Sequence, residues 1–99
     1  MVNNLRCLII DDEPLAIDVI ENYLQRLNVA SISRCENPVE AFQLISNQQF
    51  DLVFLDIEMP YGNGFQLLDR LMPVDFEIIF ITAYDNYAVK AIRYCALDY

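Results

Sequence analysis

Apolar runs alternate with helix-like segments along the chain. Three of these runs are apolar without interruption, and a fourth alternates apolar with polar residues. The uninterrupted runs are CLII (7–10), LVFL (52–55) and IIFI (78–81), and the alternating run is ASIS (30–33). Apolar residues also recur at helical spacing in segments that begin near Pro14, Asn37, Gly64 and Asp85. The sequence therefore predicts the order β-α-β-α-β-α-β-α, which is typical of a parallel sheet with helices packed on its faces.

The same pattern predicts the order of the strands in the sheet. Strands that are apolar on both sides are buried on both faces, so the three uninterrupted runs should be interior and the alternating run an edge. Right-handed crossovers then favour the order 2-1-3-4, with a switch point between the first and third strands. Asp11 and Asp12 follow the first of these strands, and Asp56 follows the third. The topology thus predicts that three carboxylates meet in the crevice where such sheets bind ligands.

Two helix starts carry recognisable signals. Pro14 suits the first turn of a helix, and apolar residues follow it at helical spacing. They are Leu15, Ile17, Val19, Ile20, Tyr23, Leu24 and Leu27. In the segment NPVE, Asn37 can cap a helix, Pro38 takes the first position, and Glu40 completes a pattern like a capping box.

Length and composition indicate one globular domain. The chain has 99 residues, of which 56% are apolar and 21% are charged. No apolar run approaches the roughly 18 residues of a membrane span, and the segment MVNNLR lacks the features of a signal peptide. We therefore expect a cytoplasmic protein. Its three cysteines (Cys7, Cys35 and Cys95) form no CxxC pair, so we interpret them as small buried hydrophobic residues.

The charge balance excludes several classes of function. Six basic residues against fifteen acidic ones give a net charge of −9, which argues against a nucleic-acid surface, because phosphate contacts need clustered Lys and Arg. The chain has no histidine and so lacks the commonest general base near neutral pH. Any chemistry must therefore use carboxylates, and the binding partners should be cationic proteins or metal ions.

The three carboxylates at the predicted crevice suggest a specific chemistry. Together they repel one another, and a hard divalent cation such as Mg²⁺ removes that cost. With a metal bound, one carboxylate can act as nucleophile toward a phosphoryl group. Asp56 is the best candidate because it stands alone at its strand end, whereas Asp11 and Asp12 would hold the ion. Thr82 ends the fourth strand in the same way, so its hydroxyl can bond a phosphoryl oxygen.

Each of these residues also has a simpler interpretation when it is taken alone. Asp12 could be a helix N-cap, Asp56 could open the following loop, and Thr82 could be an ordinary strand or cap residue. Gly62 and Gly64 could be turn residues, since GNG is no dinucleotide-binding fingerprint. Independent caps need not converge on one switch point, so the arrangement of three acids favours the chemical interpretation.

Three motifs, IIDDEP, LVFLDIEMPYGNG and IIFITAYDNYAVKAI, give the chain a clear resemblance. It resembles the receiver (phosphoacceptor) domain of two-component response regulators, and within them the receivers that precede a LytTR-type DNA-binding domain (the LytR/AlgR-like subgroup). The resemblance covers residues 1–99. It implies a flavodoxin-like (βα)₅ fold with the order 2-1-3-4-5. It also implies transfer of a phosphoryl group from a histidine kinase to Asp56, dependent on Mg²⁺ or Mn²⁺, to switch an output domain that binds DNA.

The resemblance also implies roles for individual residues. Asp12 corresponds to the direct metal ligand, Asp11 to an acid that acts partly through water, and the backbone carbonyl of Glu58 to a further ligand. Thr82 corresponds to the switch hydroxyl and Tyr99 to the switch aromatic residue.

In the loop after Asp56, Pro60 and Gly64 are expected to shape the turn that leads into the next helix. The resemblance is incomplete beyond Tyr99, where the sequence stops. The family lysine that pairs with the phosphoryl group should lie three residues further on. The only lysine is Lys90, which periodicity places on the polar side of the fourth helix, so the chain supplies no catalytic lysine.

Most of the fifth strand and the fifth helix are missing as well, and we expect a C-terminally truncated receiver. The fourth strand would then be a sheet edge with unpaired backbone groups. This predicts homo-oligomers that form through that edge or by exchange of a terminal element.

Two other functions stay open from the sequence. The missing lysine favours a pseudo-receiver, an interaction module that is not phosphorylated, although mutually repelling carboxylates are of no use to such a module. The segment FLDIE also faintly resembles the strand end of haloacid dehalogenase phosphohydrolases. That family has a second aspartate where Glu58 stands, and it needs later motifs that this length cannot hold.

Overall fold

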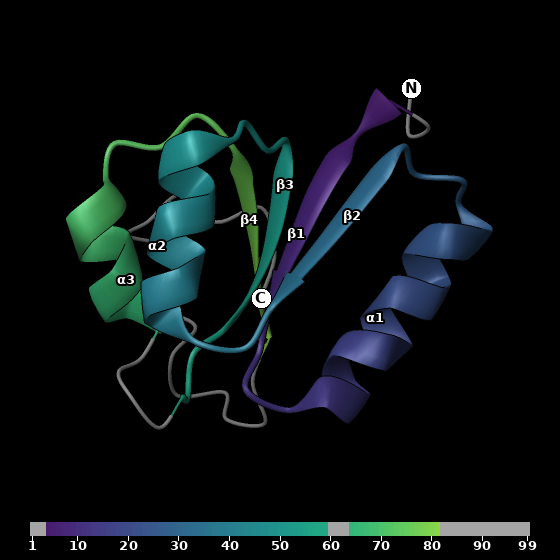
Figure 1. Ribbon diagram of the computed structural model, residues 1–99, viewed down its shortest axis with the longest axis horizontal. Coiled ribbons are helices and arrows are strands. Elements are labelled where there is room, and N and C mark those ends of the chain that lie inside the picture. Colours follow the sequence, from purple (N-terminus) through teal and green to yellow (C-terminus); the bar gives the residue numbers. More distant parts are fainter. Residues whose placement is uncertain (1–3, 60–63, 82–99) are drawn as a thin grey trace.

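The computed structural model describes residues 4–59 and 64–81, which form four strands and three helices (Figure 1). The strands are β1 (Arg6–Ile10), β2 (Ser31–Cys35), β3 (Leu52–Asp56) and β4 (Glu77–Ile81). The helices are α1 (Pro14–Arg26), α2 (Pro38–Asn47) and α3 (Gly64–Leu71). All strand pairs are parallel, and the order is β2-β1-β3-β4. This confirms the predicted α/β flavodoxin-like sheet. The helix predicted from Asp85 lies outside the described residues.

The strand β2 differs in its bounds from the prediction. The alternating pattern placed this strand at residues 30–33, whereas it pairs with β1 from Ser31 to Cys35. Arg34 stands where the alternation of apolar and polar residues would require an apolar one, which is why the prediction stopped at residue 33. Because β2 is an edge strand, its side chains need not all be apolar. The two last residues of β2 therefore lie beside the end of β1, where the acidic residues begin.

The sheet separates two apolar clusters of unequal size. Alternate residues of β1 point to opposite faces: Leu8 and Ile10 belong to the cluster under α2 and α3, and Cys7 and Ile9 to the cluster under α1. Of the residues that the structure describes, fifteen buried ones belong to the first cluster and four to the second. Figure 1 shows α2 and α3 on one side of the sheet and α1 on the other. Within residues 4–59 and 64–81, the α1 side therefore holds fewer buried side chains.

The helix α1 has a second apolar stripe that faces outward. Of the seven apolar residues predicted from Leu15 to Leu27, only Ile17 and Leu24 are buried. Leu15, Val19, Tyr23 and Leu27 follow one another at intervals of four, and each is more than half exposed, Leu15 at 78%. We call these four residues the outer α1 stripe. A regular spacing of apolar residues reveals a stripe but not whether the protein has anything to cover it.

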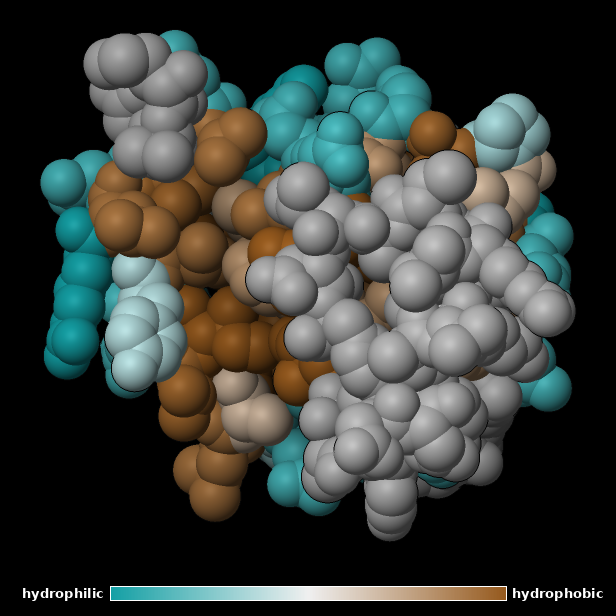
Figure 2. Space-filling model, turned by 180° about the vertical axis from the view of Figure 1, so that it is seen from behind, coloured by the Kyte–Doolittle hydropathy of each residue, from teal (hydrophilic) through white to brown (hydrophobic). Residues whose placement is uncertain are grey.

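The space-filling view from behind shows where apolar side chains gather on this side of the molecule. In Figure 2 they form a band on the left half of the face, where α1 lies, with hydrophilic side chains along the outer left margin. Within the described part of the chain, no helix is long and apolar enough to cross a membrane.

The start of α2 confirms the predicted cap. The Asn37 side chain accepts a hydrogen bond of 2.8 Å from the Glu40 backbone N–H, and Pro38 occupies the first helical position. At the start of α1, Glu13 occupies the N-cap position and makes no side-chain cap bond. The interpretation of Asp12 as the N-cap is therefore wrong, and Asp12 is left for another role.

Replacing Asn37 with Ala should lower the free energy of unfolding by about 1 kcal/mol, because one N–H of the first α2 turn loses its acceptor. Urea denaturation followed by circular dichroism measures the change. Gln43→Ala, on the exposed side of the same helix, is the matched control and should change stability by less than about 0.5 kcal/mol. Equal effects of the two substitutions would contradict the capping role.

Candidate functional site

The three acidic residues singled out by the sequence lie together at one edge of the sheet. Asp11 and Asp12 follow β1, Asp56 is the last residue of β3, and these strands are parallel neighbours. One carboxylate oxygen from each of the three lies within 4.8 Å of the others. This convergence follows from the strand order, because the carboxyl ends of adjacent parallel strands meet at one edge.

Backbone groups fix Asp11 and Asp56 in place. The Asp11 N–H donates to the Cys35 carbonyl at the end of β2 (3.1 Å), and the Glu13 N–H donates to Asp11 Oδ1 (3.0 Å). The Glu58 N–H donates in the same way to Asp56 Oδ1 (3.2 Å). Each aspartate thus accepts from the backbone two residues further on, as in an Asx-turn. These bonds orient both carboxylates toward the shared space.

Burial and mutual repulsion disfavour the ionised form of this cluster. Asp11 is only 4% exposed, and Asp56 is half-buried. Burial, followed by the charge of Asp11, raises the pKa of Asp56 from its ordinary 3.8 to about 8. Burial also raises the pKa of Asp11, against the opposing effect of the Glu13 N–H. Without a counter-ion, the cluster therefore retains a proton at neutral pH.

The donor set fits a hard divalent cation. All three side chains offer oxygen atoms, and Mg²⁺ prefers carboxylate oxygens together with water molecules. Two oxygens on one Mg²⁺ lie roughly 3–4 Å apart, so a spread of up to 4.8 Å needs only a small contraction to reach that geometry. A cation would also offset the repulsion that raises the pKa of Asp56.

Gly64 holds the next helix against the strand that ends on Asp56. It is the first residue of α3, and its N–H donates to the Ile57 carbonyl (2.9 Å). A Cβ atom at this position would lie 2.8 Å from the Asp56 carbonyl oxygen and 2.9 Å from Leu55 Cγ. The predicted helix start near Gly64 is confirmed, and the lack of a side chain at Gly64 permits close packing of α3 on the end of β3.

The structure places some of the predicted site residues and not others. Glu58 is exposed and lies two residues after Asp56. Its backbone N–H donates to the Asp56 carboxylate. Pro60, Thr82, Lys90 and Tyr99 lie outside the described residues.

Sequence reasoning missed the Cys35 carbonyl and the backbone donors of Glu13 and Glu58. No residue type signals them, because any residue carries these backbone groups. The strand order and the aspartate turns were the only available clues.

Comparisons with known proteins agree with this geometry. The profile described as the response regulator receiver domain matches residues 7–99. The chain is 44% identical over 98 residues to the sensory transduction protein LytT of Bacillus subtilis and 37% identical over 97 residues to the transcriptional regulatory protein BtsR of Escherichia coli. Each alignment covers 96% of this chain and 41% of the relative, so the chain spans about two fifths of their length.

Solved structures show the same fold. The response regulator TrrA of Thermotoga maritima, described in complex with Mg²⁺-BeF, is 34% identical with a TM-score of 0.83. The alignment covers 96% of this chain and 84% of TrrA. The receiver domain of the histidine kinase CKI1 from Arabidopsis thaliana, at 22% identity, has a TM-score of 0.78 over 95% of this chain and 82% of its own.

Replacing Asp56 with Asn should stabilise the metal-free protein by about 1–2 kcal/mol at pH 8, a gain limited by the water that screens this half-buried group. The folded pKa of Asp56, about 8, lies above its ordinary 3.8, so the native state holds an extra proton between these values. Stability of the unsubstituted protein should therefore fall as pH rises from about 4 to about 8. Urea denaturation in a chelating buffer across this range measures the slope.

The matched control for this prediction is Asp51→Asn. Hydrogen bonds from Arg6 lower the pKa of Asp51. Loss of the Asp51 carboxylate should therefore destabilise the protein at neutral pH, whereas loss of the Asp56 carboxylate should stabilise it. An unchanged pH slope in Asp56→Asn would contradict the repulsion between the carboxylates.

Replacing Gly64 with Ala should destabilise the protein by about 1–3 kcal/mol, because the added Cβ meets backbone that cannot move without shifting α3. Thermal denaturation measures this loss. Gln43→Ala again serves as the neutral substitution in a helix. A Gly64→Ala protein as stable as the parent would show that α3 can move away from β3 at no cost.

Proposed function

Because the chain belongs to the response regulator receiver domain family, we propose that it accepts a phosphoryl group on Asp56 from a sensor histidine kinase in the cytoplasm. Residues 1–99 would act as one receiver domain and as a phosphoacceptor that assists its own phosphorylation and dephosphorylation. The proposed result is a switch in a C-terminal output domain that binds DNA. The names of LytT and BtsR, a sensory transduction protein and a transcriptional regulatory protein, support this output.

The observation that carries the proposal is the convergence of the Asp11, Asp12 and Asp56 carboxylates within 4.8 Å. Asp11 and Asp12 would hold Mg²⁺ or Mn²⁺ with the Glu58 backbone carbonyl. The metal, when bound, would neutralise charge on the phosphoryl oxygens. The complex of TrrA with Mg²⁺-BeF supports this assignment.

In the proposed reaction a carboxylate oxygen of Asp56 attacks the phosphorus atom. The new O–P bond forms as the P–N bond to the kinase histidine breaks, and the electron pair of that bond stays on the imidazole nitrogen. The Glu58 N–H at 3.2 Å from Asp56 Oδ1 holds the carboxylate during attack. Thr82 and Tyr99 keep their proposed switch roles, and Pro60 its proposed role in the loop.

The outer α1 stripe supports a protein as the phosphoryl donor. It starts at Leu15, three residues after Asp12, and runs along α1 to Leu27. An exposed apolar row of this kind marks an interaction site, and a helix packed on it would lie beside the acidic cluster. Homo-oligomers through the outer edge of β4 or by exchange of a terminal element remain a separate prediction.

Incubation with acetyl phosphate and Mg²⁺ should add one phosphoryl group to the protein, as read by intact mass. Asp56→Asn should abolish the adduct, and so should removal of the metal with EDTA. Asp51→Asn, at the other end of β3, keeps the site and should be phosphorylated normally.

Three outcomes would separate the alternatives. A chain that binds Mg²⁺ but never gains mass would be a pseudo-receiver, an interaction module that is not phosphorylated. Steady release of phosphate with turnover would instead indicate a phosphohydrolase. An adduct that survives in Asp56→Asn would show that another residue is the acceptor.

A further inference from the structure

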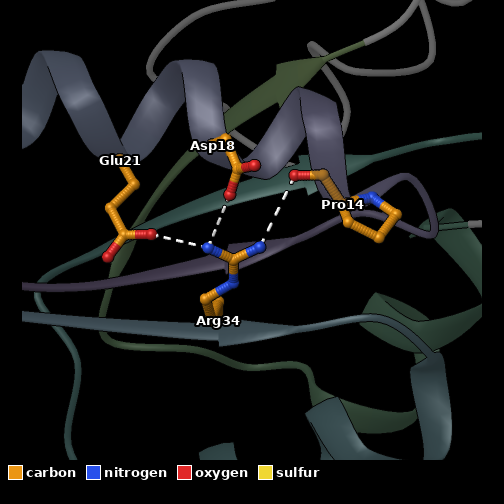
Figure 3. Close-up of polar contacts among 4 residues, drawn as sticks. All are labelled: Pro14, Asp18, Glu21 and Arg34. Carbon is orange, nitrogen blue, oxygen red and sulfur yellow. Dashed lines mark hydrogen bonds and ion pairs between the residues drawn. The ribbon is translucent and has the colours of Figure 1, made fainter.

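Arg34 joins the edge strand to the first two turns of α1 (Figure 3). Its Nη1 donates to Asp18 Oδ1 (2.8 Å) and to Glu21 Oε1 (2.7 Å), and its Nη2 lies 3.5 Å from the Pro14 carbonyl oxygen. All three partners lie on α1 at intervals of four and three residues, so they form one row along the helix. The guanidinium group therefore holds α1 at its first residue and at two points further along.

The next residue of β2 holds the opposite end of the same connection. The Cys35 carbonyl accepts the N–H of Asp11 (3.1 Å), the first residue after β1. Two successive residues of β2 thus fix both ends of the segment between β1 and α1. That segment consists of Asp11, Asp12 and Glu13, and it supplies two of the three acidic side chains.

We propose that Arg34 is a positioning residue for the metal site. It would act by fixing the start of α1 and thereby the short segment that carries Asp11 and Asp12. The inference rests on the proposed function, because it assumes that these acids hold a metal. Arg34 itself contacts neither acid. Its effect would pass through Pro14 and through the Glu13 N–H that donates to Asp11 Oδ1.

The packing around α1 explains why a polar clamp matters here. Ile17 and Leu24 of this helix are buried, and Ile20 packs beside them. Apolar contacts are non-directional, so the polar contacts of Arg34 add a constraint on the rotation of α1 and on its slide along the sheet. The side chain of Arg34 is 39% exposed, and that of Glu21 is 25% exposed. A guanidinium group with several donors in a fixed fork defines geometry better than an ammonium group does.

The simplest competing explanation is that Arg34 affects the site only through its charge. The two explanations predict opposite signs. Loss of a positive charge makes the chain more acidic, and charge alone would then tighten the binding of Mg²⁺. Loss of the clamp would weaken binding, because the acids would have to be ordered when the metal arrives.

Arg6 offers a matched control at the other end of the sheet. Its Nε and Nη2 donate to the Asp51 carboxylate (3.0 and 3.1 Å), so it too joins two elements through a partly exposed ion pair. Arg6→Met and Arg34→Met change the net charge equally. Only Arg34 adjoins the segment that carries the acids.

The experiment compares Arg34→Met, Arg34→Lys and Arg6→Met with the unsubstituted chain. Titration calorimetry should show the Mg²⁺ dissociation constant rising by about 3- to 10-fold in Arg34→Met and by less in Arg34→Lys. It should be unchanged or slightly lower in Arg6→Met. Hydrogen exchange followed by NMR in metal-free protein should be faster at the Glu13 and Ile17 amides in Arg34→Met only.

Each result decides the matter. Unchanged or tighter Mg²⁺ binding in Arg34→Met, or amide exchange no faster than in Arg6→Met, would overturn the proposal. If Arg34→Met fails to fold, Arg34→Lys and Glu21→Gln test the same contacts with a smaller change of structure. The exchange measurement needs no metal, so it judges the clamp even if the chain binds no Mg²⁺. Phosphorylation of the unsubstituted chain judges the proposed function separately.

Discussion

Three carboxyl groups within 4.8 Å of one another at the edge of a parallel sheet raise the electrostatic energy of the folded chain. Other features of the structure keep them there. The apolar β1 and β3 pair in register up to Ile10 and Leu55, so the next residues of both strands emerge together. Burial then strengthens the repulsion, because few water molecules screen it. The rest of the fold has to supply the energy that holds this arrangement.

Among the described residues, the two faces of the sheet carry apolar clusters of unequal size. The larger cluster packs between the sheet and the helices α2 and α3. It includes Phe65 and Phe80, whose ring centroids lie 5.0 Å apart. On the other face, Ile17 and Leu24 of α1 are buried, Ile20 packs beside them, and Arg34 adds its polar contacts. Both β1 and β3 contribute side chains to both clusters. The chain continues from Asp56 toward α3, whereas Asp11 and Asp12 lead into α1. The proposed acceptor and the proposed metal ligands would therefore depend on the contacts of different helices.

Sequence patterns predicted those features that depend on one residue type at one spacing. The strand order and the Asn37 cap are of this kind, as is the meeting of Asp11 with Asp56. Features that depend on which atoms pack against a residue in the folded chain were not predictable. The outward stripe on α1 has the same periodicity as its inner face. The helix start at Gly64 was predicted, but no sequence pattern records how closely the Asp56 carbonyl oxygen approaches this residue.

The raised pKa of Asp56, about 8, links these observations to the proposed reaction. A carboxylic acid that keeps its proton is a poor nucleophile, so metal-free chain near neutral pH would hold its acceptor largely inactive. A cation bound by Asp11 and Asp12 would displace that proton and leave the Asp56 carboxylate ready to attack. Metal and proton thus compete for the same negative charge. On this argument the crowding of three acids, which lowers stability, would make the proposed phosphoryl transfer conditional on the metal, and binding of the cation would relieve the repulsion.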